Sequence, residues 1–162
     1  LLLGAGGEDG GLEIKGMEAV RSDWTRAAAA FQTRLLQLIL GGRPVSEVED
    51  YIRQTLEQLR TGALDDLLVY SRRLRKPVSA YTKNRPPHVQ AALMLPEEQR
   101  EGRIEYLITT EGPQPPSIRS APVDLDHYAQ KQLRPIAESL CAPLGVNVAQ
   151  LFDPSQQLSL FG

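Results

Sequence analysis

Two amphipathic helical stretches, joined by a short link that contains Gly41-Gly42, constrain the fold of this chain more than any other feature. From about residue 23 to residue 40, apolar side chains recur at helical spacing, and the glycine pair ends the pattern. The side chains on this face are Ala28, Phe31, Leu35, Leu38 and Ile39. A second helix is predicted up to Gly62, which occupies the position of a C-terminal cap. Two helices joined by so short a link are expected to pack as a hairpin.

The start of the second helix carries a capping signal. Ser46 and Glu49 have the spacing of a capping box, in which each side chain accepts a hydrogen bond from a free backbone amide. We therefore expect Ser46 to cap this helix. Its apolar stripe consists of Val48, Ile52, Leu56 and Leu59.

Short strands and a short helix are predicted in the middle of the chain. Residues 103–110 show the alternation that makes them the clearest strand, and residues 67–74 are strand-like or extended. Pro86-Pro87 pre-sets the first turn of a helix that runs to about Leu95. The Gly-Pro-Gln-Pro-Pro sequence at residues 112–116 favours a loop.

A third long helix is expected towards the carboxyl end. Asp124 or Asp126 can cap it, and Pro143 closes it. Its inward positions are Leu133, Ile136, Ala137 and Leu140. A short turn is expected at residues 147–152. Together these elements indicate an α+β fold that is predominantly α-helical, with short β-strands.

The amino end shows no targeting signal. Residues 1–3 and 12–15 read as two strands that flank a Gly-rich loop, so we expect a hairpin at the edge of a sheet. The chain begins with leucine rather than methionine and has no basic residue before its short apolar run, so we identify no signal peptide. No stretch approaches eighteen apolar residues, so we expect no membrane partner and a cytoplasmic location. We also expect a fragment of a longer chain.

Composition narrows the classes of function. The 162 residues suffice for one domain, or for one domain and a piece of another. The formal net charge is -2, so any nucleic-acid binding must come from a local patch. One cysteine and two histidines cannot form an internal disulfide or a zinc cluster. We expect Cys141 to be a small packed side chain at the end of a helix.

The Asp124-Leu125-Asp126 sequence is a candidate metal site. Two aspartates at this spacing could share metal ions in phosphoryl transfer. Their place after Pro122 and before a helix instead favours capping of free backbone amides. We find no Gly-rich phosphate loop, and neither His88 nor His127 has a nucleophile at a suggestive spacing. We therefore assign no catalytic residue, metal ligand or cofactor to this chain.

Basic residues are concentrated in one segment. No acidic residue lies between residues 72 and 85, whereas acids concentrate from Glu47 to Asp66. The candidate DNA-binding residues, interleaved with Tyr70 and Tyr81, are Arg72, Arg73, Arg75, Lys76, Lys83 and Arg85. Charge alone leaves two readings open, a surface that contacts phosphates and a solvated basic loop.

One stretch near the amino end is more specific. Residues 15–23 read Lys-Gly-Met-Glu-Ala-Val-Arg-Ser-Asp. They closely resemble the Lys-Gly-x-Glu-x-x-Arg-x-Asp stretch that joins the palm to the thumb in family B DNA polymerases. The resemblance covers essentially the whole chain and points to the bacterial branch of the family. It continues through Arg72 to Pro77, Pro87-His88-Val89, Pro122-Val123-Asp124 and His127-Tyr128.

The resemblance implies a role in DNA synthesis. Residues 1–22 would be the end of the palm, residues 23–152 a thumb that binds the primer-template duplex, and residues 153–162 a flexible tail. Lys15 and Arg21 would contact DNA together with the basic segment. The parent would be a DNA-directed DNA polymerase, a nucleotidyltransferase of replication and repair associated with the nucleoid. Its catalytic carboxylates and Mg²⁺ would lie upstream of residue 1, so the fragment alone would be inactive.

The carboxyl end carries a second resemblance. Residues 157–161, Gln-Leu-Ser-Leu-Phe, resemble the pentapeptide by which bacterial polymerases bind the sliding clamp. The clamp-binding candidates are Gln157, Leu158, Leu160 and Phe161. The alternative is a frayed apolar end, which would leave two large apolar side chains exposed without a partner.

Two other functions fit parts of the pattern. One is a free-standing, non-catalytic adaptor that binds DNA or the sliding clamp, and it would require a start codon close to Leu1. The other is an α+β interaction module whose basic loop binds nothing. Binding of primer-template DNA at low salt would distinguish this module, which would not bind, from the polymerase fragment and from the adaptor.

Overall fold

The two amphipathic stretches form the predicted helical hairpin. The computed structural model describes residues 24–153. Its first two helices are α1 (Arg26–Leu40) and α2 (Val45–Thr61). Phe31 of α1 stacks on Tyr51 of α2 with 5.7 Å between ring centroids, and Phe31 is only 1% exposed. Gly62 ends α2 in the left-handed conformation, as predicted, with a φ of 87°.

The capping box predicted at Ser46 and Glu49 is wrong. Pro44 is the N-cap of α2, and no side chain donates or accepts a capping bond there. The helix begins at Val45 because the carbonyl of Pro44 already accepts the amide of Glu47 at 2.9 Å. Ser46 therefore lies inside the first turn, where its hydroxyl cannot act as a cap.

The third long helix forms, but with a π-helical turn in it. Its parts are α4 (Leu125–Tyr128), the π-helical residues 129–133 and α5 (Arg134–Cys141). All four predicted inward residues are buried. The helix ends at Cys141, two residues before Pro143, and Cys141 is packed there as predicted. Burial raises the pKa of its thiol to about 11, so Cys141 is an inert part of the core.

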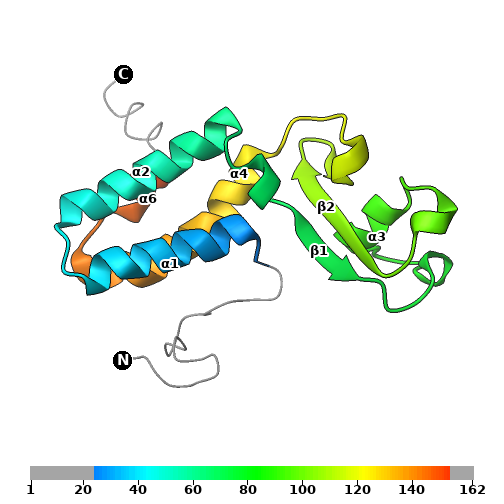
Figure 1. Cartoon of the computed structure of the whole chain (residues 1–162), viewed down its shortest axis with the longest axis horizontal. Helices are drawn as coiled ribbons and strands as arrows, with labels where there is room; N and C mark the ends of the chain where they lie inside the picture. The colour runs from blue at the N-terminus through cyan, green and yellow to red at the C-terminus, as the bar shows by residue number, and fades with distance from the viewer. Residues whose placement is uncertain (1–23, 154–162) are drawn as a thin grey trace.

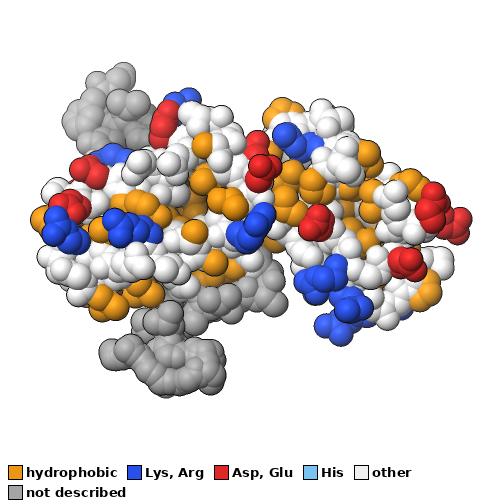
Figure 2. Space-filling view, viewed as in Figure 1, with side chains coloured by type: hydrophobic (Ala, Val, Ile, Leu, Met, Phe, Trp, Pro, Cys, Tyr) orange, Lys and Arg blue, Asp and Glu red, His pale blue; other side chains and the backbone are white. Residues whose placement is uncertain are grey.

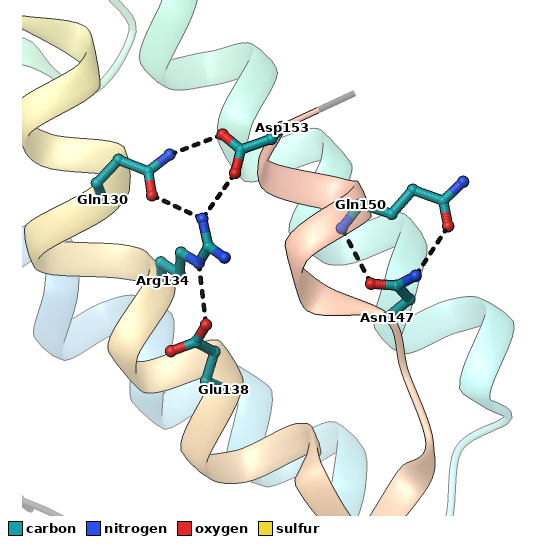
Figure 3. A network of polar contacts seen from close by, with 6 residues as sticks. All are labelled: Gln130, Arg134, Glu138, Asn147, Gln150 and Asp153. Carbon is teal, nitrogen blue, oxygen red and sulfur yellow. Dashed lines mark hydrogen bonds and ion pairs between the residues drawn. The ribbon is translucent and has the colours of Figure 1, made fainter. Parts of the chain in front are cut away.

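The turn expected at residues 147–152 is instead a short helix, α6 (Val148–Phe152), capped by Asn147. It packs on α2 and α5, and α5 packs on α1, which completes a helical lobe (Figure 1). Arg134 of α5 fixes the end of α6, because its Nη1 donates to Asp153 at 2.7 Å and to Gln130 at 2.9 Å (Figure 3). Gln130 in turn donates to Asp153 at 3.2 Å.

A second lobe is built on a small antiparallel sheet with the order β1-β2-β3. Its elements are β1 (Tyr70–Arg73), α3 (Pro87–Ala92), β2 (Arg103–Thr109) and β3 (Gly112–Gln114). The strand predicted from residue 103 and the helix start at Pro87 are confirmed. The helix ends at Ala92 rather than Leu95, and the extended segment 67–74 contributes only β1 as a strand.

The loop predicted at residues 112–116 is wrong for its first three residues. They form β3, in which Gly112 pairs with Thr109 and Pro113 pairs with Ile108. Gly112 has a φ of 97°, which allows the chain to reverse after the two residues that precede it. Proline is tolerated here because β3 is an edge strand of the sheet.

An aromatic cluster joins the two lobes, with α4 lying between them (Figure 1). Tyr128 of α4 is fully buried, and its hydroxyl accepts the amide of Ile108 in β2 at 2.9 Å. The hydroxyl oxygen of Tyr70 in β1 lies 2.8 Å from Nε2 of His127. The ring of Tyr70 stacks on the ring of Tyr106, with 5.1 Å between the centroids. The sheet is therefore held to the helical lobe by packed rings and directed hydrogen bonds.

None of the helices within residues 24–153 has the length and apolar character that a bilayer crossing requires. The hairpin predicted at residues 1–15 lies outside the described residues. The same is true of Lys15, Arg21 and the four clamp-binding candidates, which are Gln157, Leu158, Leu160 and Phe161.

Candidate nucleic-acid interface

All six cations of the basic segment are exposed on the sheet lobe. Arg72 and Arg73 lie on β1, and the other four lie on the loop that leads from β1 to α3. Strand geometry places Arg72 and Arg73 on opposite faces of the sheet, because successive side chains of a strand alternate. The six cations therefore lie on one strand and on the loop that follows it, and the two on the strand leave opposite faces of the sheet.

Tyr81 organises the loop. Its ring lies 4.7 Å from Nζ of Lys76, its hydroxyl accepts the amide of Arg75 at 3.3 Å, and its carbonyl accepts Nε of Arg85 at 3.0 Å. The cation–π contact directs Lys76 across the ring without neutralising its charge. One tyrosine thus contacts three of the six basic residues, Lys76 and Arg85 through their side chains and Arg75 through its backbone amide.

These cations have no carboxylate partner within the described part of the chain. The ion pairs found there involve other cations, namely Arg43, Arg53, Arg60, Arg119 and Arg134. On α2 the arginine side chains lie among Asp and Glu, whereas Lys and Arg side chains gather at one edge of the sheet lobe (Figure 2). The sheet lobe therefore carries a local positive charge that an external anion can neutralise.

His88 lies beneath this surface. It is 4% exposed, its ring meets Tyr81 edge-on at 6.2 Å, and its Nδ1 has no hydrogen-bond partner within residues 24–153. Burial first, and the nearby positive charge of Arg72 second, lower the pKa of His88 below its ordinary value of 6.5. Burial likewise lowers the pKa of His127.

We expect these lowered pKa values to make the chain less stable in mild acid. The unfolded chain takes up protons near pH 6.5 that the folded chain resists, so stability is full above that pH and falls as the pH drops below it. Each histidine contributes at most about 1.4 kcal/mol per pH unit. Urea unfolding at about pH 7.5 and at about pH 5.5 measures the change in the free energy of unfolding. Both pH values lie above the range in which carboxylates titrate. His88→Leu should reduce the loss, and an unchanged pH slope in this variant would contradict the prediction.

Asp124 is a helix cap in the structure. Its Oδ1 accepts the amide of His127 at 3.0 Å, at the start of α4. This is the capping role predicted for Asp124, whereas Asp126 lies exposed in the first turn. Within residues 24–153 no group of three or more His, Cys, Asp or Glu side chains could hold a metal ion.

Sequence reasoning missed Arg103. It lies thirty residues beyond Arg73 along the chain, but the register of β1 and β2 places the two directly opposite each other. Alternation predicted the strand that contains Arg103, yet alternation does not reveal which residue of another strand will face it. The structure therefore adds one basic residue to the end of the sheet lobe.

Comparison with known proteins identifies the family. The sequence profile described as DNA polymerase family B matches residues 3–154. This chain belongs to DNA polymerase family B. It is 41% identical to DNA polymerase II of Escherichia coli over 158 residues, which cover 91% of this chain and 20% of that protein. It is 33% identical to DNA polymerase 2 of Aeropyrum pernix over 168 residues, again 20% of the relative.

A solved structure supports the fold. The family B DNA polymerase from the archaeon Pyrobaculum calidifontis matches with a TM-score of 0.62 and 30% identity, over 77% of this chain and 18% of that one. The predicted α+β, mostly helical fold and the predicted resemblance to family B DNA polymerases are confirmed. The chain spans about a fifth of the length of these relatives.

Proposed function

We propose that this chain is the thumb, with the end of the palm, of a DNA-directed DNA polymerase of the bacterial DNA polymerase II type. The thumb, residues 23–152, binds the primer-template duplex, and residues 1–22 are the end of the palm with the palm-thumb junction. The observation that carries this proposal is the set of six exposed cations on the sheet lobe that no carboxylate neutralises within residues 24–153. Family membership identifies the anion as the DNA backbone.

The proposed division of labour places catalysis outside this chain. A polymerase palm supplies carboxylates that hold Mg²⁺ and activate the primer end. Asp124 is committed to capping α4, so it does not supply such a ligand here. The role of this chain is to hold the duplex in position and to lower its tendency to dissociate. In this proposal the chain is a fragment and does not add nucleotides by itself.

The test is the salt dependence of duplex binding by the 162-residue chain. If about four of the six cations contact phosphates, the logarithm of affinity falls with the logarithm of salt concentration with a slope near ~-3.6. Fluorescence anisotropy with a labelled primer-template duplex measures this slope. A slope near zero, or no binding at low salt, would remove the basic surface from the proposed function.

We also propose that residues 153–162 form a tail that binds the bacterial sliding clamp. The last described residue, Asp153, is fixed by Arg134 and Gln130, so the tail starts from a defined point on the helical lobe (Figure 3). The anchors are the apolar side chains of the Gln-Leu-Ser-Leu-Phe sequence at residues 157–161. Their burial against a clamp, less the cost of ordering the tail, supports binding in the micromolar range.

A further inference from the structure

The sheet places two arginines directly opposite each other. Arg73 of β1 is the register partner of Arg103 of β2. The amide of Leu74 donates to the carbonyl of Gly102 at 2.8 Å, so those two residues form a hydrogen-bonded pair. Arg73 and Arg103 are then the adjacent non-hydrogen-bonded pair, the kind in which opposed side chains lie closest. Both side chains leave the same face of the sheet.

This arrangement is unfavourable for the protein by itself. Like charges directly opposite each other in a sheet are destabilising. Glu105 shares the face, opposite Ser71, but it forms no ion pair with either arginine. Within the described residues neither arginine has any other carboxylate partner. The pair of positive charges is therefore left for an anion from outside the chain.

Arg103 is already oriented for such an anion. Its Nε donates to Oγ of Ser71 at 2.9 Å, and its Nη2 donates to the carbonyl of Ser71 at 3.0 Å. These two bonds fix the plane of the guanidinium, while Nη1 has no hydrogen-bond acceptor within residues 24–153. Arg103 and Ser71 also line a groove of about 660 Å³ on this face, together with Glu105, Pro115 and Pro116. A ligand can therefore reach the guanidinium from solvent.

We propose that Arg73 and Arg103 form a cross-strand clamp for one phosphate of the duplex backbone. Two guanidinium groups can share the oxygens of one phosphate through charge-assisted hydrogen bonds, and the phosphate removes the repulsion between them. This inference rests on the proposed function and extends the DNA-binding surface beyond residues 72–85. It makes Arg103, a residue from a distant part of the sequence, a DNA contact.

The test uses the 162-residue chain with Arg73→Gln, Arg103→Gln and the double variant. We expect each single variant to weaken primer-template binding by about eightfold at about 0.1 M salt, the effect of one lost phosphate contact. The double variant should be little weaker than either single variant, because both arginines hold one phosphate. Arg60→Gln, which removes an exposed arginine paired with Glu57 on α2, is the matched control and should leave binding unchanged.

Thermal unfolding without DNA separates this role from a structural one. Arg73→Gln removes a like charge and no hydrogen bond found within residues 24–153, so the melting temperature should stay the same or rise. A fall in melting temperature that accounts for the weaker binding would overturn the clamp. If the fold-losses in DNA affinity of the two single variants multiply in the double variant, the two arginines bind separate phosphates. That result would also overturn the clamp.

Two further outcomes distinguish the clamp from the surface around it. If replacing Arg72 and Lys76 weakens duplex binding while Arg73→Gln and Arg103→Gln do not, the clamp fails and the proposed function stands. If none of these variants affects binding, the proposed function fails as well. Inorganic phosphate at matched ionic strength serves as a competitor. If it raises the melting temperature through Arg73 while duplex affinity is insensitive to Arg73, the site takes free phosphate and the assignment to DNA is overturned.

Discussion

Replacing Arg72, Arg75, Lys76 and Lys83 together with glutamine should weaken primer-template binding by about 10³-fold at about 0.1 M salt. Each phosphate contact contributes about 0.9 to the slope of log affinity against log salt, so the loss of four contacts flattens the slope by about 3.6. The loop should keep its shape, because the bonds from the amide of Arg75 and from Arg85 to Tyr81 do not involve the replaced groups. Anisotropy titrations across a salt series measure both quantities.

A matched control removes the same number of charges from the other lobe. Arg34, Arg43, Arg53 and Arg60 are exposed on the helical hairpin, and the last three form ion pairs with neighbouring carboxylates. Replacing all four with glutamine gives the same net charge as the first variant. Screening over about 10 Å at this salt concentration should limit its effect to less than about tenfold. Equal losses in the two variants would show that net charge, and not the basic surface, governs binding.

The helical lobe was predictable because its signals are local. Apolar side chains, such as Phe31 in α1 and Ile52 in α2, recur at helical spacing within short stretches of chain. Gly62 ends α2 in the left-handed conformation that glycine adopts most readily. The capping box at Ser46 failed because a competing local signal, Pro44, fixes the start of the same helix two residues earlier. Local patterns therefore predict which helices form more reliably than where they begin.

The sheet lobe was less predictable because its contacts join distant residues. Nothing local to Gly112-Pro113-Gln114 indicates a strand, and these residues become one only because the edge of β2 lies beside them. The basic segment is visible in the sequence. That Tyr81 contacts Lys76, Arg75 and Arg85 is revealed only by the structure. The opposition of Arg73 and Arg103 depends on strand register, which one sequence does not specify in a short, partly exposed pair of strands.

The double replacement of Leu160 and Phe161 with alanine should nearly abolish binding to the sliding clamp. Each large apolar anchor contributes roughly 1.5 to 3 kcal/mol when buried, so the loss of both weakens binding by about 10²- to 10⁴-fold. An affinity in the micromolar range would then fall below detection in a surface-plasmon or anisotropy titration of the 162-residue chain against the bacterial clamp.

The control for the tail is Ser159→Ala, which lies between the two leucines and leaves both apolar anchors in place. It should bind the clamp with unchanged affinity. Neither variant touches Arg134, Gln130 or Asp153, so the melting temperature and the affinity for primer-template DNA should match those of the unaltered chain. This separation is the decisive feature of the experiment, because DNA binding is assigned to the sheet lobe and clamp binding to a segment beyond α6. Clamp affinity that survives the loss of both anchors would place the clamp contact elsewhere on the chain.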